Sequence, residues 1–200
     1  MMGKITKFNI VIYGCDNTGK TTLAHSLMEE LGGTQYDAIY TKSLGPAPIY
    51  EQIDFLDKHI HNKSYQPGHV QVEIMDRFPI IEEFVCGNII RNKNQFDGYN
   101  KQSIGRYLDS VNMFIHCCPG MKQVNKWGTR EQMDGVKENA YALYSMYEAV
   151  KYVFPGMGDR TLEYDFTNPT HKNFVIDVVD HVCDFFEGYK SFLKWGGQER

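Results

Sequence analysis

Residues 14 to 21 read Gly14-Cys15-Asp16-Asn17-Thr18-Gly19-Lys20-Thr21, which matches the pattern G-x-x-x-x-G-K-[ST] without a gap. The preceding segment, 7–13, is rich in β-branched and aromatic residues, as expected of a buried strand. The following segment, 22–31, carries three leucines at four-residue spacing and is followed by a glycine pair, which predicts a helix. The motif therefore lies between a strand and a helix, the context that this phosphate-binding pattern requires.

The residue types of the motif suit the binding of an anion. Glycines at both ends let the backbone turn tightly and approach a ligand closely. Amide groups of the loop and of the helix start are expected to surround a di- or triphosphate with partial positive charge. The residues predicted to hold the nucleotide in this way are Gly14, Asn17, Thr18, Gly19, Lys20, Thr21 and Thr22. Within this set, Lys20 is expected to bridge the β- and γ-phosphates, and the Thr21 hydroxyl to hold Mg²⁺.

Composition limits the classes of protein that the chain can represent. Its 200 residues are enough for one domain with a sizeable core, and we expect a single domain over residues 1–200. The formal net charge of −4 argues against a general, charge-driven nucleic-acid binder. No apolar run is long enough to span a bilayer. The five cysteines form no C-x-x-C pair and read as reduced thiols, which indicates a cytoplasmic protein.

Strand and helix patterns alternate along the chain. Strands are expected over 7–13, 37–42, 70–75, 111–117 and 161–166. Helices are expected over 22–31, 50–61, 79–90, 136–153 and 171–193, with a surface loop over 92–102. This alternation predicts an α/β fold with a parallel sheet covered by helices on both faces. Ligands of such sheets bind at the carboxyl ends of the strands.

A second candidate site, Asp76-Arg77, follows the third expected strand. An acid at the carboxyl end of a buried strand can hold Mg²⁺, directly or through water. The neighbouring guanidinium offers a planar fork for a phosphate or for a phosphoryl group in transfer. A simple ion pair that caps a strand or a helix start is the structural alternative. Because the chain also contains the phosphate loop, we favour the functional interpretation.

The acid Asp16 inside the loop, together with Asp76-Arg77-Phe78 after a strand, resembles the thymidylate kinases and the wider group of nucleotide and deoxynucleoside kinases. The order of elements agrees over nearly the whole chain. The resemblance implies the three-layer P-loop kinase fold, with a five-stranded parallel sheet, ATP and Mg²⁺ as cofactors, and a basic lid over about 119–135. It implies that Asp16 contacts the sugar 3′-hydroxyl, that Asp76 assists Mg²⁺ and the acceptor, and that Arg77, followed by Phe78, grips the acceptor phosphate. Pro79 and the divergent loops look more like viral or phage enzymes.

Further roles follow from the same resemblance. Because Asn17 stands where some thymidylate kinases have an arginine, the catalytic positive charge is expected from the lid, with Arg130 as first choice and Lys126 as second. The segment after the fifth strand, which contains Asn168, resembles the place that holds the donor adenine. Lys42 is the only cation where these kinases often have an arginine-rich segment, and it is expected to contact the acceptor phosphate.

Base recognition is the point at which the chain departs from the thymidylate kinases. Their helix before the D-R strand reads the base with an aromatic residue and an arginine. Here that helix offers Tyr50 and Phe55 without an arginine, and Phe55 is predicted to bind the substrate. Tyr141, Tyr144 and Tyr147 are spaced three apart and are expected to share one face, more often a core face than a base-stacking one. A modified pyrimidine, or a broader range of deoxynucleotides, fits this departure.

The leading hypothesis is an ATP- and Mg²⁺-dependent kinase that phosphorylates a deoxynucleoside monophosphate, dTMP or a related pyrimidine, to the diphosphate. One alternative is a kinase for a hydroxyl acceptor, such as a deoxynucleoside or a hydroxymethylated pyrimidine in DNA, with Asp76 as general base. Another is a nucleotide-binding module without an acceptor. The guanine-reading motif N-K-x-D is absent, because Asn125-Lys126 is followed by Trp127-Gly128. Thymidylate kinases are commonly homodimers, so the resemblance allows a homodimer here.

Overall fold

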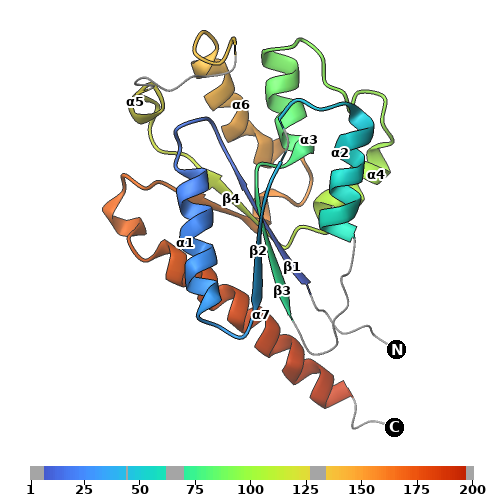
Figure 1. The fold of residues 1–200 in the computed structure, drawn as a ribbon, viewed down its shortest axis with the longest axis vertical. Helices are drawn as coiled ribbons and strands as arrows, with labels where there is room; N and C mark the ends of the chain where they lie inside the picture. Colours follow the sequence, from blue (N-terminus) through green and yellow to red (C-terminus); the bar gives the residue numbers. More distant parts are fainter. Residues whose placement is uncertain (1–6, 44, 62–69, 127–133, 197–200) are drawn as a thin grey trace.

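The computed structural model describes residues 7–43, 45–61, 70–126 and 134–196, in which strands and helices alternate (Figure 1). The strands of this described part are β1 (Lys7–Tyr13), β2 (Asp37–Lys42), β3 (Gln71–Asp76), β4 (Met113–Cys117) and β5 (Thr161–Tyr164). The α-helices are α1 (Lys20–Gly32), α2 (Ile49–Leu56), α3 (Pro79–Glu82), α4 (Lys101–Asp109), α5 (Met121–Val124), α6 (Ala140–Val153) and α7 (Phe174–Gly196). Two π-helical turns are η1 (Asp57–His61) and η2 (Glu83–Gly87), and two 3-10 turns are η3 (Gly158–Arg160) and η4 (Pro169–His171). Within the described ranges, none of the helices is both long and apolar enough to cross a membrane.

The strands form one parallel sheet in the order β2-β3-β1-β4-β5. Strand β1 lies at its centre, with β3 on one side and β4 on the other, so the direction of strand progression reverses there. The register pairs Ile12 and Lys42 with Asp76, and Tyr13 with His116. The carboxyl ends of four strands therefore meet at one edge, at the switch point where α/β sheets bind ligands. The expected five-stranded parallel sheet is confirmed.

The sheet is covered on both faces, because β1 sends its side chains alternately to opposite sides. Phe8, Ile10 and Ile12 pack toward α1 and α7, which lie together on one side of the sheet in Figure 1. Val11 and Tyr13 belong to the opposite cluster, to which α2, α3, α4 and α6 each contribute buried apolar side chains. These two apolar layers give the three-layer α/β architecture and hold the phosphate loop at the edge of a rigid sheet.

A buried acid ties the turn η1 to the sheet. Glu73 of β3 is almost fully buried, and its carboxylate accepts hydrogen bonds from Thr41 (2.8 Å) and Gln71 (3.0 Å). It also pairs with Lys7 (3.0 Å) and with the Nδ1 atom of His59 (2.6 Å). A buried carboxylate is tolerated where several donors satisfy it. Since η1 continues α2, this cluster helps to position α2 beside the carboxyl ends of the strands.

The main difference from the sequence-based prediction is helix α4. We expected a loop over 92–102 and no helix between this loop and the fourth strand. In the structure Asn100 caps a helix, its side chain accepting a hydrogen bond from the Gln102 backbone amide (2.8 Å). The pattern is weak because Gly105 and several polar residues dilute it, although the capping asparagine and the apolar pair Ile104 and Leu108 are its signature.

Smaller differences concern element boundaries. The helix expected from 136 begins at 140, the one expected from 171 begins at 174, and the fifth strand ends at 164 instead of 166. The helix expected over 50–61 is split into α2 and the π-helical turn η1. Element ends depend on caps and tertiary contacts that periodicity does not contain.

Candidate active site

The phosphate loop joins β1 to α1 and has the backbone geometry that its glycines predict. Gly14 has φ +138°, and a Cβ atom built there would lie 2.5 Å from the carbonyl oxygen of Cys117. Gly19 has φ +82° and Asn17 has φ +64°. The Thr18 hydroxyl donates a hydrogen bond to the Cys15 carbonyl (2.8 Å). Only glycine fits at position 14, because the loop packs directly against the end of β4.

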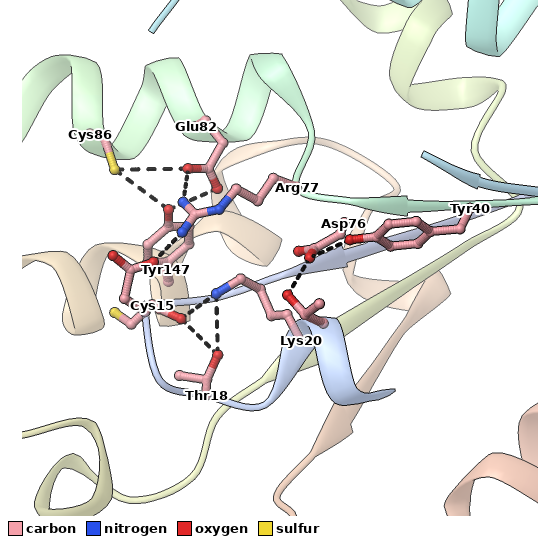
Figure 2. A network of polar contacts seen from close by, with 11 residues as sticks. Cys15, Thr18, Lys20, Tyr40, Asp76, Arg77, Glu82, Cys86 and Tyr147 are labelled. Carbon is pink, nitrogen blue, oxygen red and sulfur yellow. Dashed lines mark hydrogen bonds and ion pairs between the residues drawn. The ribbon is translucent and has the colours of Figure 1, made fainter. Parts of the chain in front are cut away.

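Lys20 is buried beneath this loop. Its ammonium group donates a hydrogen bond to the Cys15 carbonyl and lies 3.5 Å from the Thr18 hydroxyl (Figure 2). Burial lowers the pKa of Lys20, and the nearby Arg77 guanidinium lowers it further. A buried cation inside a loop of amide donors is an arrangement that an anionic phosphate would stabilise.

Asp76 ends β3 directly across from the start of α1. It is 1% exposed, and its Oδ2 atom accepts hydrogen bonds from the hydroxyls of Thr21 (2.6 Å) and Tyr40 (3.2 Å). Its Oδ1 atom is buried and has no hydrogen-bond partner within the described residues. A hydroxyl oxygen beside a carboxylate oxygen that lacks a partner is a donor set that suits Mg²⁺, which takes its other ligands from water and phosphate. The predicted metal residues Thr21 and Asp76 are therefore neighbours, and they fit this ion.

Arg77 lies between two carboxylates. It has φ +76°, rare for a residue with a side chain, and its backbone amide donates to the Ile12 carbonyl (2.9 Å). The guanidinium pairs with Glu82 at 2.6 Å (Figure 2) and also with Asp16. Glu82 is the main reason that the pKa of Arg77 lies above its ordinary value. The ion pair that was the structural alternative for Arg77 is thus present, and it lies inside the candidate site.

A cavity of about 240 Å³ opens beside the phosphate loop. Its lining combines charged and polar side chains with one apolar wall, which comes mostly from the segment 136–147. The charged residues of the lining are Asp16, Lys42, Arg77, Glu82, Glu83 and Arg91. Asp76, in contrast, is not part of this lining and faces Thr21 instead. The predicted acceptor residues Asp16, Lys42 and Arg77 are therefore brought together around one cavity.

A buried polar cluster lies at the same cavity and was not predicted. Glu83 accepts hydrogen bonds from the side chains of Gln52 (3.1 Å) and Arg91 (2.6 Å) and from the backbone amide of Gln95 (3.1 Å). Gln52 and Gln95 both donate to the Ala47 carbonyl as well. These residues come from α2, η2 and the loop that follows, so only the folded chain reveals that they form one cluster.

Two predicted substrate residues lie elsewhere, as far as the described residues define the cavity. Phe78 is fully buried in the apolar cluster between the sheet and α3, and it does not line the cavity. Phe55 is buried against His59, with ring centroids 4.6 Å apart, and is not part of the lining either. On α2 it is Gln52, one turn before Phe55, that reaches the cavity, whereas the Phe55 ring packs on His59.

The predicted lid is only partly described. Arg130, the first choice for the catalytic cation, lies outside the described residues. Lys126 is exposed, and its ammonium donates to the side chain of Gln123 (2.8 Å). Thr22 is exposed in the first turn of α1. The side chain of Asn168 caps η4 by accepting from the Thr170 amide (3.0 Å).

The predicted tyrosine face is wrong. Tyr141 is 75% exposed, whereas Tyr147 is 2% exposed and lines the cavity. Six residues along a helix correspond to a rotation of about 600°, which leaves the two side chains about 120° apart. Tyr147 donates a hydrogen bond to Glu82 (2.8 Å), whose carboxylate also holds Arg77. Helix α6 is thereby connected through Glu82 to Arg77 at the cavity.

Phe166 is an aromatic residue beside the phosphate loop to which the sequence assigned no role. It is 43% exposed, and its ring packs on the phosphate loop, 3.1 Å from where a Cβ atom of Gly19 would lie. The turn that carries it is fixed, because Asp165 accepts from the Thr167 amide (2.8 Å) and hydroxyl (2.6 Å). A partly exposed ring beside a phosphate site offers an apolar face to a ligand.

Comparison with known proteins finds likeness in structure. No family model and no curated protein matches the chain. The YorR protein of Bacillus subtilis, solved in complex with phosphorylated GDP, is 15% identical, with a TM-score of 0.63 over 90% of this chain and 98% of that chain. Deoxyadenosine kinase from M. mycoides with the products dCMP and a flexible dCDP is 14% identical, with a TM-score of 0.52 over 89% of this chain and 100% of that chain. The same kinase with bound dATP is 16% identical, with a TM-score of 0.51 over 88% of this chain and 100% of that chain. At these identities the fold is what is shared, and this chain has the three-layer α/β fold of the P-loop kinases.

Proposed function

We propose that this protein is an ATP- and Mg²⁺-dependent kinase that phosphorylates a deoxynucleoside monophosphate, dTMP or a related pyrimidine nucleotide, in the manner of thymidylate kinases. One observation carries the proposal. Asp16, Lys42 and Arg77 line a cavity beside the phosphate loop, whereas Asp76 faces Thr21 rather than that cavity. The cytoplasmic location that the reduced thiols indicate and the homodimer that the resemblance allows belong to the same proposal.

The donor side is assigned to the phosphate loop. Loop amides and Lys20 would hold the β- and γ-phosphates, and Phe166 would offer its exposed ring to the adenine. Thr21 and Asp76 would hold Mg²⁺, which neutralises charge on the phosphates when it is bound. The likeness to deoxyadenosine kinase with bound dATP supports nucleotide binding by this fold.

The acceptor side is assigned to the cavity. Lys42, at the end of β2, and Arg77 supply positive charge to an acceptor phosphate, and Asp16 supplies an acceptor for a sugar hydroxyl. The cluster of Gln52, Glu83 and Arg91 is the polar end of the cavity available to a base. A phosphate oxygen is already anionic, so in-line attack on the γ-phosphorus needs no general base. Positioning and electrostatic stabilisation carry the rate.

A hydroxyl acceptor is the second candidate, and the likeness to a deoxynucleoside kinase favours it. A hydroxyl must lose its proton during transfer, so this reaction needs a base at the acceptor. Asp76 was the residue considered for that role, but it is engaged by Thr21 and Tyr40 and does not line the cavity. The carboxylates that do line the cavity are paired, Asp16 and Glu82 with Arg77 and Glu83 with Arg91, and the cation Lys42 is part of the same lining. These contacts favour an acceptor that is itself an anion.

The test is ADP release with Mg-ATP against deoxynucleoside monophosphates, free deoxynucleosides and oligonucleotides that contain modified pyrimidines. Turnover with a pyrimidine monophosphate supports the proposal. Turnover with nucleosides or oligonucleotides and none with monophosphates refutes it in favour of a hydroxyl acceptor. Nucleotide binding without turnover on any acceptor indicates a binding module.

Two variants sharpen the test. The substitution Lys42→Ala is expected to raise the KM for the monophosphate about tenfold and to leave the KM for ATP unchanged, because it removes one charge-assisted contact. The substitution Lys101→Ala, at an exposed position that starts α4, is the matched control and should change neither. Equal effects of both variants would show that Lys42 does not contact the acceptor.

A further inference from the structure

We propose that Tyr40 is a positioning residue for the divalent metal of the ATP complex: its hydroxyl holds the Asp76 carboxylate so that one oxygen is occupied by donors and the other is kept for the ion. This inference rests on the proposed function, because the metal concerned is the one that accompanies ATP. Figure 2 shows the Tyr40 hydroxyl directed at Asp76 from the side opposite Lys20. In the sequence, Tyr40 is distinguished only as a residue of the second strand.

Sheet register explains how Tyr40 reaches the site. Tyr40 of β2 pairs with Ile74 of β3, and two residues further along β3 lies Asp76. Residues two apart on a strand share a face, so the phenol extends diagonally across the strand pair to the carboxylate. The ring also packs against His25 of α1, with centroids 5.1 Å apart. Contacts with both a strand and a helix fix the position of the phenol.

The hydrogen bonds at Asp76 are divided unequally between its two oxygens. Oδ2 accepts from both Thr21 (2.6 Å) and Tyr40 (3.2 Å), whereas the buried Oδ1 has no hydrogen-bond partner in the described part of the chain. A buried carboxylate oxygen without a partner is costly unless a cation or donor meets it. Two donors on Oδ2 therefore resist rotation of the carboxylate, which would exchange its two oxygens.

The two donors have different roles. Thr21 is a candidate metal ligand, so its hydroxyl oxygen is shared between the carboxylate and the ion. Tyr40 donates to Asp76 and is not needed as a ligand. Partners of this kind typically change metal affinity by about 10–100-fold when they are removed.

The test measures the affinity for ATP by calorimetric titration under two conditions, in the presence of Mg²⁺ and in EDTA, which removes the metal. The ratio of these two affinities reports the contribution of the metal. For Tyr40→Phe we expect the ratio of the two affinities to fall about tenfold, with the affinity for metal-free ATP unchanged. The ring is retained, so the variant keeps its packing on α1, and a thermal melt verifies folding. The loss should also appear as a smaller protein-bound fraction of Mn²⁺ when the protein with ATP is titrated with Mn²⁺ and followed by electron paramagnetic resonance.

A matched control removes the same type of bond elsewhere. Tyr107 donates to Asp57 (2.7 Å) within the opposite helical layer, so Tyr107→Phe should lower stability and leave the ratio unchanged. An unchanged ratio in Tyr40→Phe would overturn the inference while leaving the proposed function intact. An equal fall in both variants would overturn it as well, since the effect would then be structural. A wild-type protein that binds ATP equally with and without Mg²⁺ would refute the proposed function and the inference together.

Discussion

His116 makes the stability of this protein sensitive to mild acid. It lies on β4, is 2% exposed, and stacks on Tyr13 with ring centroids 4.8 Å apart and an interplanar angle of 9°. Burial lowers the pKa of His116 to about 4 from its ordinary value of 6.5. Glu163 favours the protonated form, and Lys151 and Lys20 oppose it, but burial dominates. The consequence reaches the site, since Tyr13 directly precedes the phosphate loop.

The sign and size of the effect follow from linkage. As pH falls below about 6.5 the unfolded chain binds a proton at this position and the folded chain does not, so stability decreases. The stabilising contribution of the neutral, buried imidazole is fully present above pH 6.5 and is lost between pH 6.5 and about 4. Below that pH the loss of stability from this group levels off. Each unit between the two pKa values corresponds to about 1.4 kcal/mol, so the loss amounts to about 3 kcal/mol. That is a large share of the roughly 5–15 kcal/mol that stabilises an ordinary domain.

The assay is urea unfolding at a series of pH values between 8 and 4 for the wild type and for His116→Phe, which keeps a ring on Tyr13 but cannot titrate. We expect the wild type to lose about 3 kcal/mol more than the variant over this range. His25→Gln, at an exposed position of α1, is the control and should follow the wild type. If the wild type and His116→Phe lose stability in parallel, His116 is not buried as a neutral ring, and the reasoning fails.

Three further substitutions test the site. Gly14→Ala should destabilise the fold by at least about 2 kcal/mol in thermal melts and abolish ATP binding, because its Cβ atom meets a backbone carbonyl at a positive φ; Gly32→Ala, with open space around it, should not. Tyr147→Phe removes a donor from Glu82 and should raise the acceptor KM about tenfold with the KM for ATP unchanged in steady-state kinetics. Phe166→Ala should show the reverse, a KM for ATP raised about tenfold with an unchanged acceptor KM. If both variants shift the same constant, the assignment of donor and acceptor sides is wrong.

The sequence alone was sufficient to predict the phosphate loop and the parallel sheet. The loop pattern specifies backbone conformations that few residues other than glycine adopt, and the apolar periods of the segments around it are local properties of the chain. Helix α4 escaped prediction because its glycine and polar residues weaken the apolar periodicity. Its stability comes from burial of its own Tyr107 and Leu108 in the core. Packing of this kind is not encoded within one segment.

The residues of the candidate site also fall into two groups, those that the sequence predicts and those that only the folded structure brings together. Lys20, Thr21, Asp76 and Arg77 could be read from the sequence, because each occupies a fixed place at the end of a strand or the start of a helix. The sheet register and the helix rotation determined the rest. They put Tyr40 on Asp76, turned Tyr147 toward Glu82, and brought Gln52 to the cavity in place of Phe55. Such contacts join residues far apart in the chain, so they exist only once the sheet has aligned its strands and the helices have packed on it.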